Sequence, residues 1–324
     1  SISWGGATGI GGSVGQDIYE IGVKDGFLIN TGDGDESVNI EIDSIVETLP
    51  TDFSIVVNTG DGSDDITVTS FAAGYGGDLN LSAEAITINS GVSLGATGTE
   101  IGDVTLAAAD STAGTFAGTN SATASVTING SIVSDGFVEV SADAVATASQ
   151  TSSVGLASGF NLDTTATVTV GDDAIITGSA VSLAADTDVD VNISGDYVQA
   201  AVALTDIETT TTVSVGAGAQ ITAGTGDLDV TTSGNQSLVI AASTDTDVDV
   251  ELQSAANFFG AATNVDFTNG FDLLISTLDV SRDTSVELNG ASGNQATINA
   301  TGLAVISATS DGEIKNIVKS DFVG

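Results

Sequence analysis

Hydrophobic and polar residues alternate along most of this chain. Between residues 165 and 191, apolar residues such as Val168 and Val189 alternate with Thr or Asp. Strict alternation places one row of side chains on each face of a β-strand, and Thr and Val suit a half-buried pleated surface. Segments 171–173 and 178–179, rich in Gly, Asp and Ser, interrupt the alternation and are typical of turns. The stretch therefore predicts three strands joined by two turns.

The same pattern recurs at a drifting spacing. Val126 precedes Val168 by 42 residues, and Val168 precedes Val213 by 45. Further copies cover residues 85–107, 124–142, 211–231 and 285–308. Such recurrence is typical of stacked repeats, so we expect an all-β fold, a parallel β-solenoid built from drifting repeats. Coils of about 22 residues, each advancing about 4.8 Å, would give about 12–14 coils. Tandem β-sandwich domains are the alternative fold.

The pattern divides the chain into four segments. They are a Gly-rich N-terminal arm (1–16), acidic-turn β repeats (17–76), the main solenoid repeats (77–254), and an aromatic insert with a C-terminal solenoid or cap (255–324). The arm holds Trp4, and it is either a flexible leader or a strand that adds to the sheet edge of a neighbouring subunit.

The charge balance limits the partners that the chain can bind. The sequence has 44 acidic and four basic residues, a net charge of −40. Nucleic acid and anionic membrane surfaces need clustered Lys and Arg, so neither is an expected partner. No apolar run reaches the length of a membrane-spanning helix, so membrane insertion is not expected. An acidic excess of this size suits salt water or bound cations, which predicts a secreted or cell-surface protein of a marine or halophilic microbe.

The residue types available for catalysis are few. The chain has no His and no Cys, the side chains most often used as general bases and nucleophiles. We therefore expect a non-enzymatic protein. A β-helix that binds or cleaves polysaccharide is a remote alternative, because carboxylate pairs can hydrolyse glycosides.

Two turns near the N-terminus share the string N-T-G-D-G, at residues 30–34 and 58–62. Their carboxylates are Asp33, Asp35 and Glu36 in one turn, and Asp61, Asp64 and Asp65 in the other. Calcium prefers carboxylate, carbonyl and water oxygens, so the turns are candidate calcium sites. The alternative interpretation is a pair of solvated Asp-Gly turns.

These turns resemble the acidic Gly-Asp repeats of haemolysin-type calcium-binding proteins. The resemblance covers about a sixth of the chain and implies a parallel β-roll that binds calcium between successive turns. The tandem nonapeptide of those proteins does not occur in this sequence.

A second acidic set lies in the main repeats, where the string D-T-D-V-D-V occurs twice. Its carboxylates are Asp186, Asp188, Asp190, Asp245, Asp247 and Asp249. Each triplet occupies one face of a strand, so aligned coils would form a ladder of carboxylates on the outside of the solenoid. Such a ladder either binds cations or is a solvated face that deters edge association.

Aromatic and basic residues supply candidate interface positions. They are Trp4, Phe258, Phe259, Phe267, Phe271, Lys315 and Lys319. The phenylalanines are either a core plug or a subunit contact. The two lysines either dock onto the acidic face of the next subunit or belong to an ordinary terminal strand.

The Thr-, Val-, Gly- and Asp-rich repeats at 77–310 resemble those of large bacterial surface exoproteins, the filamentous-haemagglutinin-like adhesins. The resemblance implies a secreted, elongated β-structure. We therefore expect a structural extracellular protein that forms a homo-oligomer or polymer as a surface fibre, sheath or matrix, with calcium as a stabilising ion. The alternative is a segment of a large monomeric calcium-dependent adhesin that contacts surface glycans or other cells.

Overall fold

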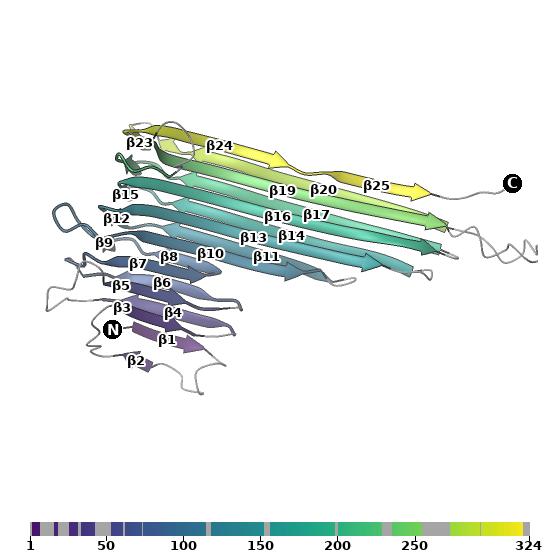
Figure 1. Ribbon diagram of the computed structural model, residues 1–324, viewed down its shortest axis with the longest axis horizontal. Coiled ribbons are helices and arrows are strands. Elements are labelled where there is room, and N and C mark those ends of the chain that lie inside the picture. The colour runs from purple at the N-terminus through teal and green to yellow at the C-terminus, as the bar shows by residue number, and fades with distance from the viewer. Residues whose placement is uncertain are drawn as a thin grey trace, which may run out of the picture.

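The computed structural model is a parallel β-solenoid, as the alternating pattern predicts (Figure 1). It describes residues 2–6, 16–18, 26–31, 34–42, 53–60, 62–72, 74–114, 118–151, 156–197, 200–228, 235–254, 273–291 and 293–319. Within these ranges all regular structure is β-strand. Successive coils pair in parallel, which rules out the alternative of tandem antiparallel sandwiches.

Three sheets run along the solenoid. Sheet A contains β4 (Glu36–Glu41), β6 (Asp65–Ser70), β8 (Ala85–Ile88), β11 (Thr119–Ile128), β14 (Leu156–Val170), β17 (Ala200–Val215) and β20 (Leu273–Leu288). Sheet B contains β3 (Gly26–Asn30), β5 (Ser54–Asn58), β7 (Asp78–Ala83), β10 (Val104–Ala113), β13 (Phe137–Thr151), β16 (Ala180–Tyr197), β19 (Gln236–Ser254), β24 (Leu303–Asp311) and β25 (Ile314–Lys319). Sheet C contains β9 (Ser93–Leu94), β12 (Ser131–Val133), β15 (Ile175–Gly178), β18 (Gln220–Ala223) and β23 (Thr297–Ala300).

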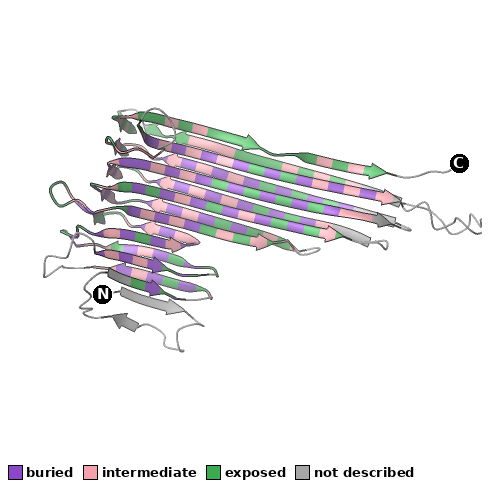
Figure 2. Ribbon diagram, in the orientation of Figure 1, coloured by how far each residue is buried: buried purple, intermediate pink, exposed green. Residues whose placement is uncertain are grey.

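The core consists of columns of like apolar side chains, one per coil. In sheet A, Val168 lies opposite Val126 and Val213. In sheet C, Ile176 lies opposite Ile132 and Ile221. All six are fully buried, and burial alternates along the strands of the inner coils (Figure 2). The alternation in the sequence therefore defines an inward apolar row and an outward polar row.

The coils are longer and fewer than about 22 residues each would give. Ile66 and Ile86 are equivalent positions 20 residues apart, whereas Val126 and Val168 are 42 apart and also belong to adjacent coils. Each long repeat is thus one coil of three strands rather than two coils. Later coils are longer still, with Val213 opposite Val286, 73 residues further along.

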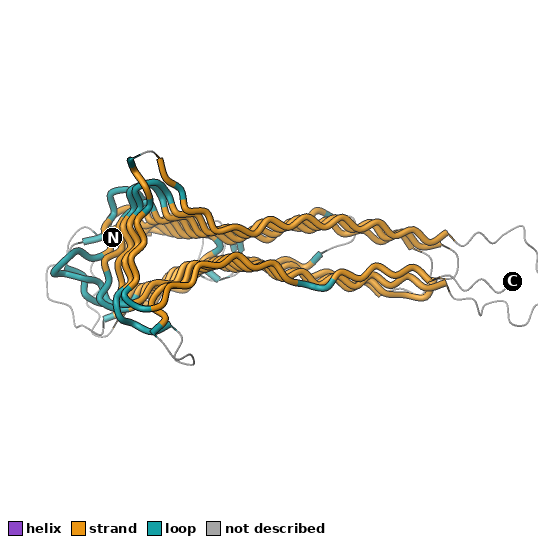
Figure 3. The backbone as a smooth tube through the Cα atoms, turned by 90° about the horizontal axis from the view of Figure 1, so that it is seen from above, coloured by secondary structure: helices purple, strands orange, loops and turns teal. Residues whose placement is uncertain are grey.

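The added length forms a second region of the molecule. In the early coils, strands of sheets A and B have four to six residues, but β16 has 18 and β19 has 19. Seen from above, a three-sided body continues into two facing layers of long strands (Figure 3). We call these layers the extension; it comprises the described residues of 144–166, 187–211, 244–284 and 314–319.

The extension has its own apolar core. Its buried residues are Ala146, Ala148, Phe160, Leu162, Val189, Val191, Ile193, Ala203, Ile207, Val248, Val250 and Leu252. This cluster is separate from the cluster that fills the body. Small and β-branched residues dominate it, because two facing sheets leave only a thin layer to fill.

One turn position between sheets A and C needs a left-handed backbone. Gly91 and Gly218 have φ values of 81° and 73° there, and Asp173 adopts φ 59° at the equivalent place. Asp tolerates this region better than most side chains, which explains the Asp-rich segment 171–173. The turn residues identified in the sequence are therefore the ones that redirect the chain.

The N-terminal segment adds to an edge of its own chain. β1 (Ile2–Gly6) pairs antiparallel with β4, and β2 (Gln16–Ile18) pairs antiparallel with β1. Trp4 lies in β1, in register with Val38. The strand-addition mode expected for this segment is thus used within the chain.

The apolar columns predict a position-specific stability effect. Leu183 is fully buried in sheet B between Val140 and Ile240. Leu183→Ala should lower the free energy of unfolding by about 2–5 kcal/mol, because it leaves a cavity. The outward neighbour Ser182 is the control, and Ser182→Ala should stay within about 0.5 kcal/mol of wild type. Chemical denaturation measures both, and equal losses would contradict the assigned faces.

Candidate functional site

The two acidic turns stack one coil apart. Ser63 N donates to Asp35 Oδ1 at 3.2 Å, and Ser37 Oγ donates to Asp65 Oδ2 at 2.5 Å. Asp35 and Asp65, two of the predicted ligands, thus each contact a serine of the other turn on the outer face, where both are exposed. Asp33 and Asp61 lie outside the described residues.

The other two carboxylates of these turns point inward. Glu36 and Asp64 are 5 % and 2 % exposed, and Glu36 N donates to Asp64 Oδ1 at 2.7 Å. These two carboxylates therefore differ from the solvated Asp-Gly turns of the alternative interpretation, because they lie inside the solenoid. The cause is strand parity, because each residue lies two positions before a buried core residue, Val38 or Ile66.

A third inward carboxylate, Glu84, belongs to none of the acidic motifs of the sequence. Asp64 N donates to Glu84 Oε2 at 2.8 Å, which places Glu84 on the next coil of the same column. Burial, with Asp64 and Asp110 as nearby negative charges, raises the pKa of Glu84 to about 7. The signal available in the sequence was only its spacing of two residues before Ile86.

The second acidic set forms an outward ladder. Asp188 lies opposite Asp245, and Asp190 lies opposite Asp247, whereas Asp186 and Asp249 face Ser243 and Asn192. The two D-T-D-V-D-V strings are therefore offset by two residues, and four of the six carboxylates pair across coils. Partial burial, followed by the charge of Asp245 and nearby aspartates, raises the pKa of Asp188.

The described carboxylates of the two acidic sets lie apart from one another. Among the residues that the structure describes, no three Asp or Glu side chains converge closely enough to hold an ion. Both acidic sets are instead spread over separate coils, and β16 and β19 each carry three carboxylates of the outward set.

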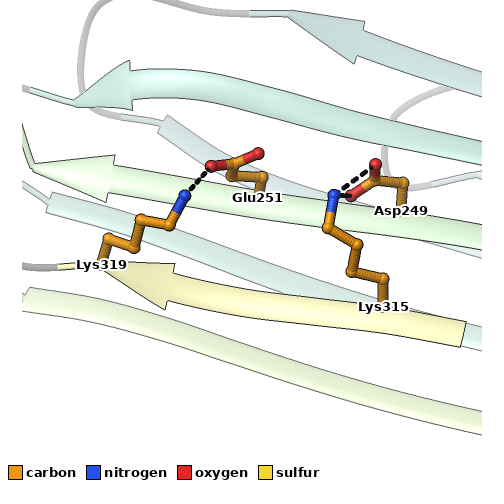
Figure 4. Close-up of polar contacts among 4 residues, drawn as sticks. All are labelled: Asp249, Glu251, Lys315 and Lys319. Atoms are coloured by element: carbon orange, nitrogen blue, oxygen red, sulfur yellow. Dashed lines mark hydrogen bonds and ion pairs between the residues drawn. The ribbon is translucent and has the colours of Figure 1, made fainter.

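The two C-terminal lysines contact the acidic face of their own chain (Figure 4). Lys315 Nζ lies 2.8 Å from Asp249 Oδ2, and Lys319 Nζ pairs with Glu251 Oε1. Both lysines belong to β25, which pairs in parallel with β19. All four side chains are at least a third exposed, so each pair contributes little stability. The predicted interface phenylalanines at 258, 259, 267 and 271 lie outside the described residues.

A buried hydroxyl network separates the body core from the extension core. Thr211 Oγ1 lies 2.6 Å from both Thr187 Oγ1 and Thr244 Oγ1, and Thr244 Oγ1 lies 2.7 Å from Thr284 Oγ1. Thr187, Thr211 and Thr244 are at most 1 % exposed. We call these four residues the threonine seam. The sequence contains so many alternating threonines that nothing marks these as buried.

The last described coil exposes part of its inward row. Leu288, Ile306, Ile314 and Val318 are 45–48 % exposed, although they lie in register with Val215, Ile240, Val248 and Leu252, which are buried. Within the described residues, β20, β23 and β24 pair in their sheets on one side only. This edge is therefore an apolar, strand-forming surface.

Comparison with known proteins yields no relative: no family model, curated protein or solved structure matches this chain. The structure also contains, in the ranges that it describes, no helix long and apolar enough to cross a membrane.

The threonine seam predicts a cost for removing one hydroxyl. Thr211→Val keeps the shape but leaves Thr187 and Thr244 without their shared partner. We expect a loss of about 1–3 kcal/mol in the free energy of unfolding. Thr210→Val, on the outward face, is the matched control and should change stability by less than about 0.5 kcal/mol. Urea titration measures the free energy of unfolding of both variants. Equal values for Thr211→Val and Thr210→Val would refute a structural role for the seam.

Proposed function

We propose that this protein is a non-enzymatic structural protein of the extracellular surface, the subunit of a self-assembling fibre, sheath or matrix that calcium stabilises. The observation that carries the proposal is the edge of the last described coil. This edge exposes an apolar row and strands that pair on one side only, and another coil stacked on it would cover both. Open strand edges are ready templates for pairing with another chain.

The charge distribution supports a second copy as the occupant of this edge. Two copies that each carry a net charge of −40 repel one another. Three of the four basic residues, Arg282, Lys315 and Lys319, lie in the last described coil. The basic side chains at this edge therefore partly offset the repulsion that a second acidic copy would meet there.

The outward carboxylates support the role of calcium. Asp188 and Asp190 directly face Asp245 and Asp247 across coils, which costs free energy unless cations screen them. Calcium is a hard cation that prefers oxygen ligands. Its binding would relieve this repulsion and stabilise the stacked form. A need for cations at the carboxylates fits a secreted protein of a salt-rich environment.

The second candidate function is a segment of a large calcium-dependent adhesin. In that case, coils that continue the same chain, rather than a second copy, cover the exposed row of β20, β24 and β25. The outward Thr and Asp rows would then be the surface presented to glycans or other cells.

Self-assembly predicts filaments or sheets in negative-stain images of the purified chain at high concentration with calcium. Ile306→Asp and Val318→Asp place charges in the exposed row and should prevent assembly. Leu204 is 54 % exposed on the outer face of sheet A, so Leu204→Asp is the control and should assemble normally. Monodisperse wild-type monomers under these conditions would rule out the fibre and leave the adhesin.

Calcium binding predicts that a chelator lowers the melting temperature at low salt by several degrees. An ion present at 100 times its Kd stabilises the folded state by about 2.7 kcal/mol. If the outward ladder binds calcium, the double variant Asp188→Asn with Asp245→Asn should show a smaller drop in melting temperature on chelation. If the acidic turns bind calcium, Asp35→Asn should show the smaller drop. NaCl at matched ionic strength controls for screening. An unchanged melting temperature after chelation would exclude calcium as a stabilising ion.

A further inference from the structure

The first and last described coils of the solenoid present strands of very different length (Figure 1). At the last described coil, β20 has 16 residues, and β24 and β25 have nine and six. In the first coils, β3 has five residues and β4 has six. A second copy stacked by its first coil would therefore cover the edge over the body and leave the exposed Ile314 and Val318 of the extension uncovered.

Two contacts across the interior fix how the edge strands of the last coil line up. Thr284 Oγ1 lies 2.7 Å from Thr244 Oγ1, and Arg282 Nη1 donates to the carbonyl oxygen of Asp311 at 2.7 Å. Asp311 is the register partner of Asp245, so β20 runs opposite to β19 and to β24. Residues equally far from the Thr244–Thr284 pair, in opposite directions along the chain, therefore lie level with each other.

Apolar residues of the two edge strands occur at the same levels. Leu288 of β20 lies level with Ile306 of β24, and Val280 of β20 lies level with Ile314 of β25. Leu288, Ile306 and Ile314 are 45–48 % exposed. A half turn about the long axis of the extension exchanges sheets A and B and keeps every level. It would place the apolar row of β20 on that of β24 and β25 of a second copy.

The charges on the outer faces select the same half turn. β20 carries Asp279, Asp283 and Glu287 there, whereas β25 carries Lys315 and Lys319. Lys315 lies level with Asp279, so this rotation brings opposite charges together. A half turn across the strands would instead place β20 on β20 and make like charges face each other, which is destabilising.

We propose that the second copy docks through its own last coil, tail to tail, about a two-fold axis along the extension. This inference rests on the proposed function and names the surface that the second copy contributes. β20 of each copy then pairs antiparallel with β24 and β25 of the other, and Lys315 of one copy meets Asp279 of the other. Such a contact is closed, so a fibre built from these pairs lengthens through a different surface.

Cysteine cross-linking tests this contact, because the chain has no cysteine of its own. Asp279→Cys and Lys315→Cys are purified separately, mixed in the presence of calcium and oxidised. The mixture should give a disulfide-linked dimer, since directly paired antiparallel residues have Cα atoms about 4.5–5.5 Å apart, within disulfide range. Each variant alone should stay unlinked, because its two cysteines would lie on opposite sheets of the dimer.

The matched control is a mixture of Asp206→Cys and Asp249→Cys. These residues are the register partners of Asp279 and Lys315 on the preceding strands, β17 and β19. In the tail-to-tail dimer they lie three strand spacings apart, about 14 Å, so they should not link. Equal linking by the control mixture would indicate random collision and overturn the contact.

Negative-stain images of the same mixture separate this inference from the proposed function. Filaments without the Asp279→Cys to Lys315→Cys link would overturn the tail-to-tail contact and leave the fibre standing. Linked dimers that never lengthen would support the contact and remove the fibre. Unlinked monomers alone would overturn both.

Discussion

The whole structure depends on in-register parallel hydrogen bonding between one coil and the next. Parallel pairing without offset places each side chain directly above its equivalent, about 4.8 Å away. This pairing stabilises the apolar core, because it stacks Val126, Val168 and Val213 into one continuous apolar column. The same constraint acts on polar residues without regard to their chemistry. It aligns Asp188 with Asp245 outside and Asp64 with Glu84 inside, where like charges meet.

The interior column at the root of the extension shows how the chain responds to that constraint. Along sheet A the column changes from Glu36, Asp64 and Glu84 to Ala124 and Ala166, and then to Thr211 and Thr284. Where the extension is absent or short, the position holds carboxylates close to the turns. Where the extension is long, the same position is deeply enclosed, and hydroxyl groups that donate to one another replace charge. This column therefore lies at the boundary between the two apolar clusters. Its residues are charged near the exposed turns and uncharged where the column is enclosed.

The sequence was sufficient for the strand pattern and the turns but not for the dimensions of the coil. Alternation around Val168 and the Gly- and Asp-rich turn at 171–173 are local signals, and both correspond to structure. The number of residues per coil depends on long-range pairing, which periodicity does not encode, so the expected coil of about 22 residues is too short for the main repeats. Glu84 stands alone between alanines and belongs to no motif. Its importance arises only because Asp64 lies on the adjacent coil, and the buried Thr211 likewise differs from Thr210 only by parity.

The long strands of the extension restrict how this protein can lengthen during evolution. A single residue inserted within Ala180–Tyr197 would exchange the two faces beyond that point, burying aspartates and exposing valines. Every neighbouring coil would oppose the change, because its columns are already in register. Extra residues are therefore expected at corners and near strand ends, as with the register shift between Gln236 and Leu238 of β19. The small hairpin of β21 (Gly290–Ala291) and β22 (Asn294–Gln295), between β20 and β23, is one such addition, and it leaves the register of both strands intact.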